Sequence, residues 1–499
     1  MTENRHVDVL IMGAGISGIG AACHLTRDFP QRSYHILERR QAIGGTWDLF
    51  RYPGIRSDSD MYTFGFNFRP WKGNKVLADG TSIREYVNAT ADEYGVREHI
   101  TFGRKVVRAD WSSATGRWSV DALDESTGVT ETWTCDFLIA GTGYYDYDAG
   151  YRPDFPGEEN FSGTLVHPQH WPDDLDYAGK RVVVIGSGAT AVTLVPAMAE
   201  TAAHVTMLQR SPSYILALPA FDKISYLLKK VMPDLAVYRL ARGRNIALQR
   251  AIYAVARRRP NFVRKVVLAS ARRHLGPGAD LSGFQPKYDP WDQRLCIVPD
   301  GDLFASIREG RADIVTDTIE TITPTGIRLA SGRELEADII ITATGLQIQL
   351  MGGAQVSVDG APVPLNQVMS YKSVLVEDVP NFAFIFGYTN ASWTLKADIA
   401  SEYVTRLLRY MNEHRYTRVV PRGSDDLRGT DSVLSSLNAG YVRRGNDALP
   451  RQGLAAPWQV LNNYLHDAPM MRRSKIDDGV LQFSRSPAAV PDEPAAVQA

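Results

Sequence analysis

The sequence predicts an α/β fold made of two doubly wound units, and two observations support this fold class. Glycine-rich loops occur at residues 13–18 (GAGISG) and 186–191 (GSGATA), each after a run of β-branched and aliphatic residues and before a helical pattern. Glycines in such a loop permit a tight turn and let the backbone approach a pyrophosphate, which binds at the helix N-terminus. Two loops in this setting predict two Rossmann-like dinucleotide-binding domains.

The elements of the first domain follow in order from the N-terminus. Residues 7–13, 16–28 and 34–38 have the patterns of a strand, a helix and a strand. The second strand ends at Glu38, about 20 residues beyond the last glycine, where dinucleotide folds place a carboxylate that bonds ribose hydroxyls. A further buried strand is predicted at Cys135–Thr142 (CDFLIAGT).

The second domain is predicted to interrupt the first. A strand at 181–186, a helix at about 190–200 and a strand at 204–209 begin it, and strand-like patterns return at 313–341. Five segments are therefore expected: the N-terminal part of the first domain (1–150), an irregular linker (151–178), the second domain (179–334) with a helical insertion at about 220–275, the return of the first domain (335–483) and a disordered tail (484–499).

Composition limits the partners and the compartment. Of 499 residues, 55 are basic and 56 are acidic, so no nucleic-acid partner is predicted. The three cysteines are far apart in the sequence and form no CxxC motif, which disfavours disulfides and a metal site. We expect a cytoplasmic protein, since the sequence contains no signal-peptide pattern and no apolar run long enough for a membrane span. The sequence predicts no particular oligomeric state.

One local charge asymmetry occurs in the predicted helical insertion. Residues 222–273 contain 14 lysines and arginines but only two acidic residues, at helix-like spacing. The favoured interpretation is a set of solvated helices that pack on the core by one face. The alternative is a peripheral membrane contact.

The two glycine loops differ in the residue that follows their second strand. Glu38 ends the first unit, whereas Arg210 and Ser211 stand at the matching place in the second. A carboxylate would repel a 2′-phosphate, while an arginine suits one. The first loop is therefore expected to bind FAD or NAD and the second NADPH. The alternative for Arg210 is an ordinary surface arginine.

Two longer motifs resemble a known family. The segment 45–58 reads GTW-x4-YPG-x3-D, and the segment 161–172 reads FxGxxxHxxxWP. Together they resemble the signatures of Baeyer–Villiger monooxygenases, which are class B flavoprotein monooxygenases. Flavin-containing monooxygenases of the wider class have Tyr or Phe where this chain has Trp171. Residues 50–60 and 388–396 are similar to the mycobacterial subgroup that includes ethionamide-activating and acid-resistance-operon monooxygenases.

The resemblance implies an oxygen-activating reaction. FAD would be held by the first domain and NADPH by the second, which is inserted in the FAD domain. A C4a-peroxyflavin formed with O2 would insert oxygen next to a ketone carbonyl, giving an ester or lactone, and would also oxygenate sulfides or thioamides. A peroxide anion beside flavin requires a fixed positive charge and exclusion of water.

Three residues are implied to act in this reaction. Arg294 matches the arginine that stabilises the peroxide, and Asp58 matches the aspartate behind it. His167, in the linker, would couple domain position to catalysis. From the residues alone, Arg294 could be a surface ion-pair partner, Asp58 a cap and His167 a loop histidine. Where many family members have a lysine that holds the NADPH phosphate, this chain has Gln293, which predicts a weaker preference for NADPH.

The expected cofactor-binding residues combine the loops and the family motifs. They are Gly13, Gly15, Ser17, Gly18, Glu38, Gly45, Thr46, Trp47, Asp58, Val106, Gly186, Ser187, Gly188, Ala189, Thr190, Ala191, Arg210, Ser211 and Gly345.

Three alternative functions remain beside this one. The first is an N- or S-oxygenating flavin monooxygenase without Baeyer–Villiger activity. The second is a reductase that passes electrons to a thiol pair, which the absence of paired cysteines disfavours. The third is a binding or membrane-associated protein that has lost catalysis, which the occupied motif positions disfavour.

Overall fold

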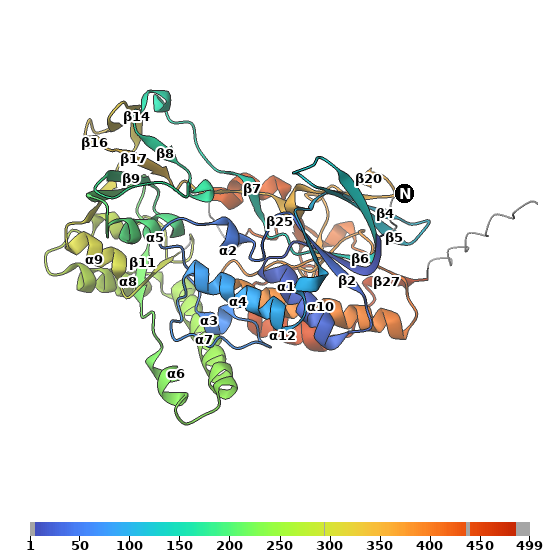
Figure 1. Ribbon diagram of the computed structural model, residues 1–499. Helices are drawn as coiled ribbons and strands as arrows, with labels where there is room; N and C mark the ends of the chain where they lie inside the picture. The colour runs from blue at the N-terminus through green and yellow to red at the C-terminus, as the bar shows by residue number, and fades with distance from the viewer. Residues whose placement is uncertain (1–4, 294, 436–439, 486–499) are drawn as a thin grey trace, which may run out of the picture.

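The computed structural model describes residues 5–293, 295–435 and 440–485, and these form two lobes (Figure 1). One lobe contains the first glycine loop and a large mixed sheet, and the other contains the second glycine loop and a smaller parallel sheet. A helical projection leaves the body between the lobes, with helix α6 (Lys223–Leu228) at its end.

The first sheet has eleven strands around a parallel centre. Strand β1 (Arg5–Met12) pairs in parallel with β2 (Tyr34–Glu38) and with β6 (Thr130–Ala140), and it is buried from Val9 onward. The remaining strands are β3 (Ile100–Phe102), β4 (Lys105–Ser112), β5 (Arg117–Leu123), β19 (Gln355–Val358), β20 (Ala361–Pro362), β21 (Ser370–Tyr371), β22 (Leu375–Val376) and β23 (Phe382–Phe384).

Helices from both ends of the chain pack together beside this sheet. They are α1 (Ile16–Asp28), α4 (Gly80–Glu93), α10 (Trp393–Glu413) and α12 (Tyr464–Arg473), and they share one hydrophobic cluster with residues of β1 and β23 (Figure 1). The C-terminal part of the chain therefore completes the first domain, because the apolar face of α1 would otherwise be exposed.

The second sheet is entirely parallel, in the order β13–β10–β9–β17–β8. Its strands are β13 (Ala312–Thr316), β10 (His204–Gln209), β9 (Arg181–Ile185), β17 (Ile339–Thr342) and β8 (Thr164–Val166). Helices α5 (Ala189–Met198) and α9 (Asp302–Arg308) pack beside it.

Two strands lie outside the segments in which the sequence places them. Strand β17 pairs with β9, so the chain is still in the second sheet at Thr342, and the first strand back in the first sheet is β19. The sequence places that return at residue 335, because the apolar run that ends at 342 resembles the last strand of the first unit. Strand β8 also pairs in the second sheet, within the segment expected to be an irregular linker.

The two crossings between the lobes run side by side. Strand β7 (Tyr145–Gly150) leaves the first lobe and pairs antiparallel with β18 (Leu346–Ile348), which returns to it. The remaining elements are β11 (Ile215–Leu218), β12 (Cys296–Pro299), β14 (Ile319–Thr323), β15 (Gly326–Leu329), β16 (Glu334–Glu336), β24 (Arg418–Pro421), β25 (Arg428–Ser432), β26 (Arg451–Gly453), β27 (Leu481–Ser484), α2 (Thr46–Leu49), α3 (Met61–Phe64) and α11 (Gly440–Gly445). The sequence places the start of the tail at residue 484, but Ser484 is the last residue of strand β27. Residues 486–499 of the predicted tail lie outside the described residues.

The predicted helical insertion comprises α6, α7 (Asp234–Arg258) and α8 (Pro260–Leu275). Arg242 of α7 is buried against the first lobe, where its Nη1 donates to the carbonyl oxygens of Tyr62 (2.8 Å) and Gly65 (2.8 Å). These hydrogen bonds attach the insertion to the C-terminal end of α3.

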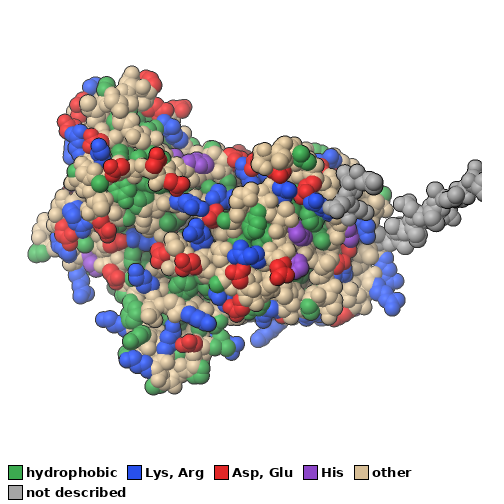
Figure 2. Space-filling view, viewed as in Figure 1, with side chains coloured by type: hydrophobic (Ala, Val, Ile, Leu, Met, Phe, Trp, Pro, Cys, Tyr) green, Lys and Arg blue, Asp and Glu red, His purple; other side chains and the backbone are tan. Residues whose placement is uncertain are grey.

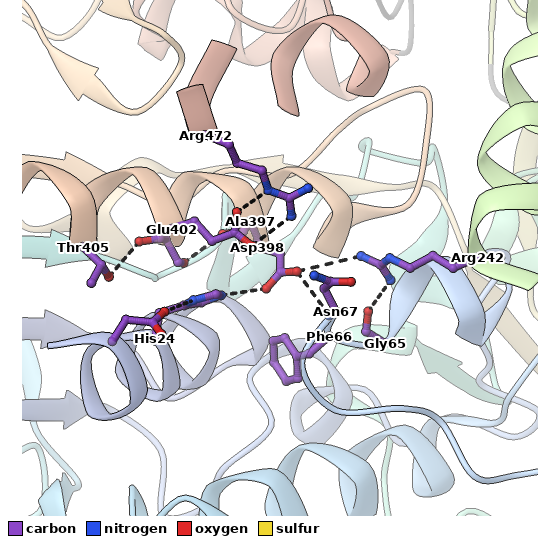
Figure 3. Close-up of polar contacts among 12 residues, drawn as sticks. His24, Gly65, Phe66, Asn67, Arg242, Ala397, Asp398, Glu402, Thr405 and Arg472 are labelled. Atoms are coloured by element: carbon purple, nitrogen blue, oxygen red, sulfur yellow. Dashed lines mark hydrogen bonds and ion pairs between the residues drawn. The ribbon is translucent and has the colours of Figure 1, made fainter. Parts of the chain in front are cut away.

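A buried ionic cluster continues from this contact (Figure 3). Asp398 of α10 lies between His24 of α1, at 2.8 Å, and Arg242 of α7, at 3.9 Å. Glu402, one turn further along α10, pairs with Arg472 of α12. Ligand atoms of His24, Asp398 and Glu402 lie within 4.8 Å of one another. Because two arginines already balance the carboxylates, we interpret the cluster as a structural ion-pair network.

No helix within the described ranges is both long enough and apolar enough to cross a membrane.

Candidate active site

A cavity of about 310 Å³ lies where the two lobes meet. Residues of both lobes line it. From the first lobe they include Gly13, Gly15, Ser17, Glu38, Gly45, Thr46, Trp47, Asp58, Val106, Tyr144, Tyr145, Tyr388 and Trp393, and from the second lobe Ala189, Thr190, Val192, Thr193 and Ile297. The carboxyl ends of β1 and β2 open into this cavity, which is where open α/β sheets bind ligands.

Two glycines of the first loop, Gly13 and Gly18, occupy positions that have no room for a side chain. Gly13 has a φ of +92°, and a Cβ on Gly18 would overlap the carbonyl oxygen of Gly13. Gly15 lies against Gly45, so that a Cβ on Gly45 would come within 3.0 Å of the Gly15 Cα. The loop therefore presents bare backbone at the N-terminus of α1, which is the cradle that a pyrophosphate requires.

Glu38 lies at the cavity wall and is buried. Its carboxylate accepts hydrogen bonds from the backbone N–H of Ala14 (2.5 Å) and of Arg40 (2.7 Å). Burial raises the pKa of Glu38 despite these two bonds. Through its bond to Ala14, the carboxylate holds the glycine loop in position, a role that the sequence did not predict. It also lies where such folds bind a ribose.

The segment 44–58 forms the side of the cavity that faces the second lobe. The Trp47 ring meets Phe64 edge to face, with centroids 5.6 Å apart. Burial raises the pKa of Tyr52 to about 12, although its hydroxyl has a hydrogen bond with Thr190 of the second lobe. Arg56 pairs with Asp302 of α9, also in the second lobe. The segment therefore contacts both lobes and couples their positions.

The second glycine loop differs from the first in its openness. Gly186 has a φ of +140°, and a Cβ there would overlap the carbonyl oxygen of Ala343, whereas a Cβ on Gly188 would meet nothing within 4 Å. The Ser187 hydroxyl donates to the carbonyl oxygen of Ser211 at 3.3 Å. This hydrogen bond places Ser211 beside the loop. Arg210, the residue before it, is exposed after the end of β10, and neither residue is part of the cavity lining.

His167 does not line the cavity. Its Nε2 lies 3.3 Å from the carbonyl oxygen of Gly345, and its Nδ1 accepts a hydrogen bond from the Gln169 N–H at 3.2 Å. A Cβ on Gly150 would overlap the imidazole ring. Burial lowers the pKa of His167. The ring is wedged between the two crossings at β7 and β18, a position from which it can affect the lobes but not the cavity directly.

Arg294 lies outside the residues that the structure describes, so its role in catalysis stays a prediction. Asp58, its predicted partner, lines the cavity.

Sequence reasoning missed most of the aromatic wall. Tyr144 stacks on Trp393 with centroids 5.2 Å apart, and Tyr441 approaches both Tyr144 and Tyr145. Of the aromatic residues in this wall, only Trp47 was named from the sequence, although Trp393 lies in the family-like segment 388–396 and also lines the cavity. The tyrosine pair after the Gly-Thr-Gly at 141–143 was an available signal, because those residues follow the carboxyl end of a central strand.

A buried polar triad supports this wall from behind. Tyr388 lines the cavity and its hydroxyl donates to Asp467 at 2.8 Å, while Lys396 lies 3.0 Å from the same carboxylate. Burial raises the pKa of Tyr388 and lowers that of Lys396. All three side chains are shielded from solvent, so the triad fixes the cavity wall to α10 and α12.

The fold and the cavity define a class of protein with two dinucleotide-binding units that share one reaction chamber. A model described as flavin-binding monooxygenase-like matches residues 6–228. The chain is 58% identical to the FAD-containing monooxygenase MymA of Mycobacterium tuberculosis, over 99% of this chain and 100% of the relative. It is 53% identical to the FAD-containing monooxygenase EthA of the same organism, over 98% and 100%. The chain therefore belongs to the FAD-containing monooxygenase family, and the resemblance stated from the motifs is confirmed.

Solved structures of lower identity share the fold. OTEMO in complex with FAD and NADP is 21% identical with a TM-score of 0.75, covering 97% of this chain and 100% of that one. Cyclohexanone monooxygenase in an open form is 18% identical with a TM-score of 0.75, covering 96% and 100%. The expected α/β fold with two dinucleotide-type sheets is confirmed.

Proposed function

We propose that this protein is an NADPH-consuming, FAD-dependent monooxygenase that inserts oxygen next to a ketone carbonyl and also oxygenates sulfides or thioamides. The observation that supports it is the shared cavity, which brings the bare first glycine loop and the start of α5 to one chamber. A single chamber permits hydride and oxygen transfer at one centre. The FAD- and NADP-bound form of OTEMO has the same fold.

The residues of the first lobe fit FAD. The loop at 13–18 offers backbone N–H groups to a pyrophosphate, and Glu38 lies where ribose hydroxyls would be bound. Trp47 and Trp393 present flat apolar surfaces to the cavity. When bound, the flavin reduced by NADPH supplies the activation of O2.

The residues of the second lobe fit NADPH. Gly188 has open space above it, and Ala189 and Thr190 reach the cavity at the N-terminus of α5. Arg210 and Ser211 flank the loop, where a 2′-phosphate would be recognised. Gln293 leaves these two residues as the main source of selectivity for the phosphate.

Oxygen transfer requires a positive charge and a dry chamber. Arg294 is proposed to supply the charge, with Asp58 orienting its guanidinium, because an arginine stays protonated and donates several hydrogen bonds. The aromatic wall around Tyr144 and Trp393 would exclude water from the reacting atoms. His167 is proposed to couple the position of the lobes to the reaction.

The test is to purify the holoenzyme and supply NADPH, O2 and an aliphatic ketone such as 2-octanone, or an alkyl aryl sulfide. Ester and sulfoxide formation, followed by mass spectrometry, is the expected result. Arg294→Ala should still oxidise NADPH but release H2O2 in place of ester. Sulfoxide formation without any ester across a broad ketone panel would favour the purely N- or S-oxygenating alternative. Ester formation by Arg294→Ala would remove that residue from the mechanism.

We also propose that residues 222–273 contact a membrane surface. This second proposal is favoured by the exposure of apolar side chains among the basic ones on α6, α7 and α8.

A further inference from the structure

The exposed apolar side chains of this protein are concentrated in one place. Of the sixteen large hydrophobic side chains that are exposed within the described residues, twelve lie between Leu218 and Val266. Isolated exposed hydrophobic residues are ordinary, but a group of them marks an interaction surface. Figure 2 shows hydrophobic and basic side chains together on the projection that ends in α6.

The end of the projection is the most apolar part. Ile224 is 60% exposed, Leu227 59%, Val231 79% and Leu235 41%. These four residues, here named the apolar tip, occupy α6, the turn after it and the first turn of α7. A hydrophobic stripe continues along α7 at Leu248, Ile252 and Val255, whose spacing places them on one face.

Basic side chains flank the apolar tip. Lys223, Lys229, Lys230 and Arg239 lie within or next to it, against only Asp222 and Asp234. Asp222 caps the N-terminus of α6 and pairs with Arg244, so its charge is already balanced. The tip therefore presents apolar side chains inside a net positive rim.

The body of the protein holds the projection in place. Tyr238 of α7 donates to the carbonyl oxygen of Phe66 at 3.0 Å, and Arg242 is buried against α3. The backbone N–H of Val76 donates to the carbonyl oxygen of Ala220 at 2.7 Å, just before α6. These contacts fix the base of the projection to the body, so the tip is held exposed to solvent.

We infer that the apolar tip inserts into the interfacial region of an anionic phospholipid bilayer, with the flanking lysines on the lipid headgroups. This inference rests on the membrane contact proposed above and assigns it to one segment and one lipid charge. Apolar side chains gain from leaving water, while lysines gain from an anionic surface. A second copy of this chain fits less well, because a symmetric contact would bring the same lysines face to face.

The test is flotation of the holoenzyme with vesicles of phosphatidylcholine alone or with about 30 mol% phosphatidylglycerol, an anionic lipid. Binding should require the anionic lipid and weaken in high salt. The double variant Leu227→Asp/Val231→Asp should bind at least about tenfold more weakly, as should Lys229→Glu/Lys230→Glu. Val129→Asp, at an equally exposed position of the first lobe (62%), and Lys180→Glu/Lys475→Glu serve as matched controls and should bind as the unchanged protein does.

A second measurement reports insertion directly. The three native cysteines are buried, so a cysteine introduced by Val231→Cys at the exposed tip can be labelled selectively with an environment-sensitive fluorophore. Its emission should shift to the blue on anionic vesicles, and the same label at Val129→Cys should not shift.

The outcomes separate the proposals. If the protein binds vesicles but the tip variants bind equally well, the assignment to the tip is wrong and the wider membrane contact stands. If the unchanged protein does not bind, both are wrong, and a tip-dependent dimer in analytical ultracentrifugation would identify a second copy as the occupant. Oxygenation of a dissolved ketone by the tip variants tests the enzymatic proposal independently.

Discussion

His24 and Asp398 lie 374 positions apart in the chain and form a buried ion pair, with Nε2 and Oδ1 2.8 Å apart. Helices α1 and α10 come from opposite ends of the first domain, and this pair joins them where α7 of the insertion also arrives through Arg242. The contact therefore ties three segments that the sequence separates widely.

The first prediction concerns the pH dependence of stability. Burial alone would lower the pKa of His24, but hydrogen bonds to Asp28 and Asp398 raise it from 6.5 to about 9. Because the pKa of His24 is higher in the folded state, protonated His24 stabilises the fold fully below pH 6.5, and this stabilisation is lost as the pH rises through about 9. It amounts to about 3 kcal/mol in the free energy of unfolding. The free energy of unfolding, measured in urea, should fall between pH 7 and 10.

The control for this prediction removes the titrating group. His24→Gln should flatten that pH dependence, whereas His414→Gln, at an exposed position, should leave it unchanged. Equal slopes for His24→Gln and the unchanged protein would contradict the assignment.

The second prediction concerns the fastening of the insertion. Arg242→Met would leave Asp398 with a weaker charge balance and the carbonyl oxygens of Tyr62 and Gly65 without their donor. We expect a loss of about 3 kcal/mol in stability. Thermal unfolding measures it, with Arg239→Met on the exposed face of the same helix as the control. A similar melting temperature for the two variants would show that the contact is dispensable.

The third prediction separates a structural glycine from a ligand-binding glycine in one loop. Gly186→Ala should lower the melting temperature, because its φ is +140° and its Cβ would overlap the Ala343 carbonyl oxygen. Gly188→Ala should leave the melting temperature unchanged, since its Cβ meets open space, but should weaken NADPH binding at least about tenfold by blocking the pyrophosphate. Titration with NADPH and thermal unfolding test both variants. Full NADPH affinity in Gly188→Ala would contradict a pyrophosphate at this loop.

The fourth prediction concerns cofactor selectivity. Arg210→Ala should raise the KM for NADPH at least about tenfold while changing the KM for NADH little. Only NADPH has a 2′-phosphate, which would lose its contact with the arginine. Lys180→Ala, another exposed cation of the second lobe, should alter neither value. Equal effects of Arg210→Ala on the KM values of both cofactors would show that Arg210 does not recognise the 2′-phosphate.

Local chemistry was sufficient to predict the two nucleotide-type units. Gly13, Gly18 and Gly186 occupy backbone positions that only glycine allows, so the glycine spacing of both loops can be recognised without tertiary information. The boundary at 335 is different. Strand β17 has the same apolar pattern as a strand of the first sheet, and its membership in the second is decided by pairing with β9.

Part of the candidate site was equally accessible. Ser17, Glu38, Trp47 and Asp58 were named from the sequence, and all line the cavity. The aromatic wall and the triad of Tyr388, Lys396 and Asp467 were not named as a site, because their partners come from distant segments. The expected helical insertion is present, and α7 and α8 pack by one face, as favoured, through residues such as Tyr238 and Val267. Other apolar residues of the insertion, among them Leu227 and Val231, are exposed.

The sequence by itself determined that the chain has two nucleotide-type units and which family it belongs to, because those properties reside in short, locally constrained motifs. Only the tertiary structure decided that one cavity is shared by both lobes, that His24 meets Asp398, and that α6 and α7 present apolar side chains to solvent. Each of these depends on long-range packing, in which burial and charge pairing select one arrangement among many that the same local patterns allow.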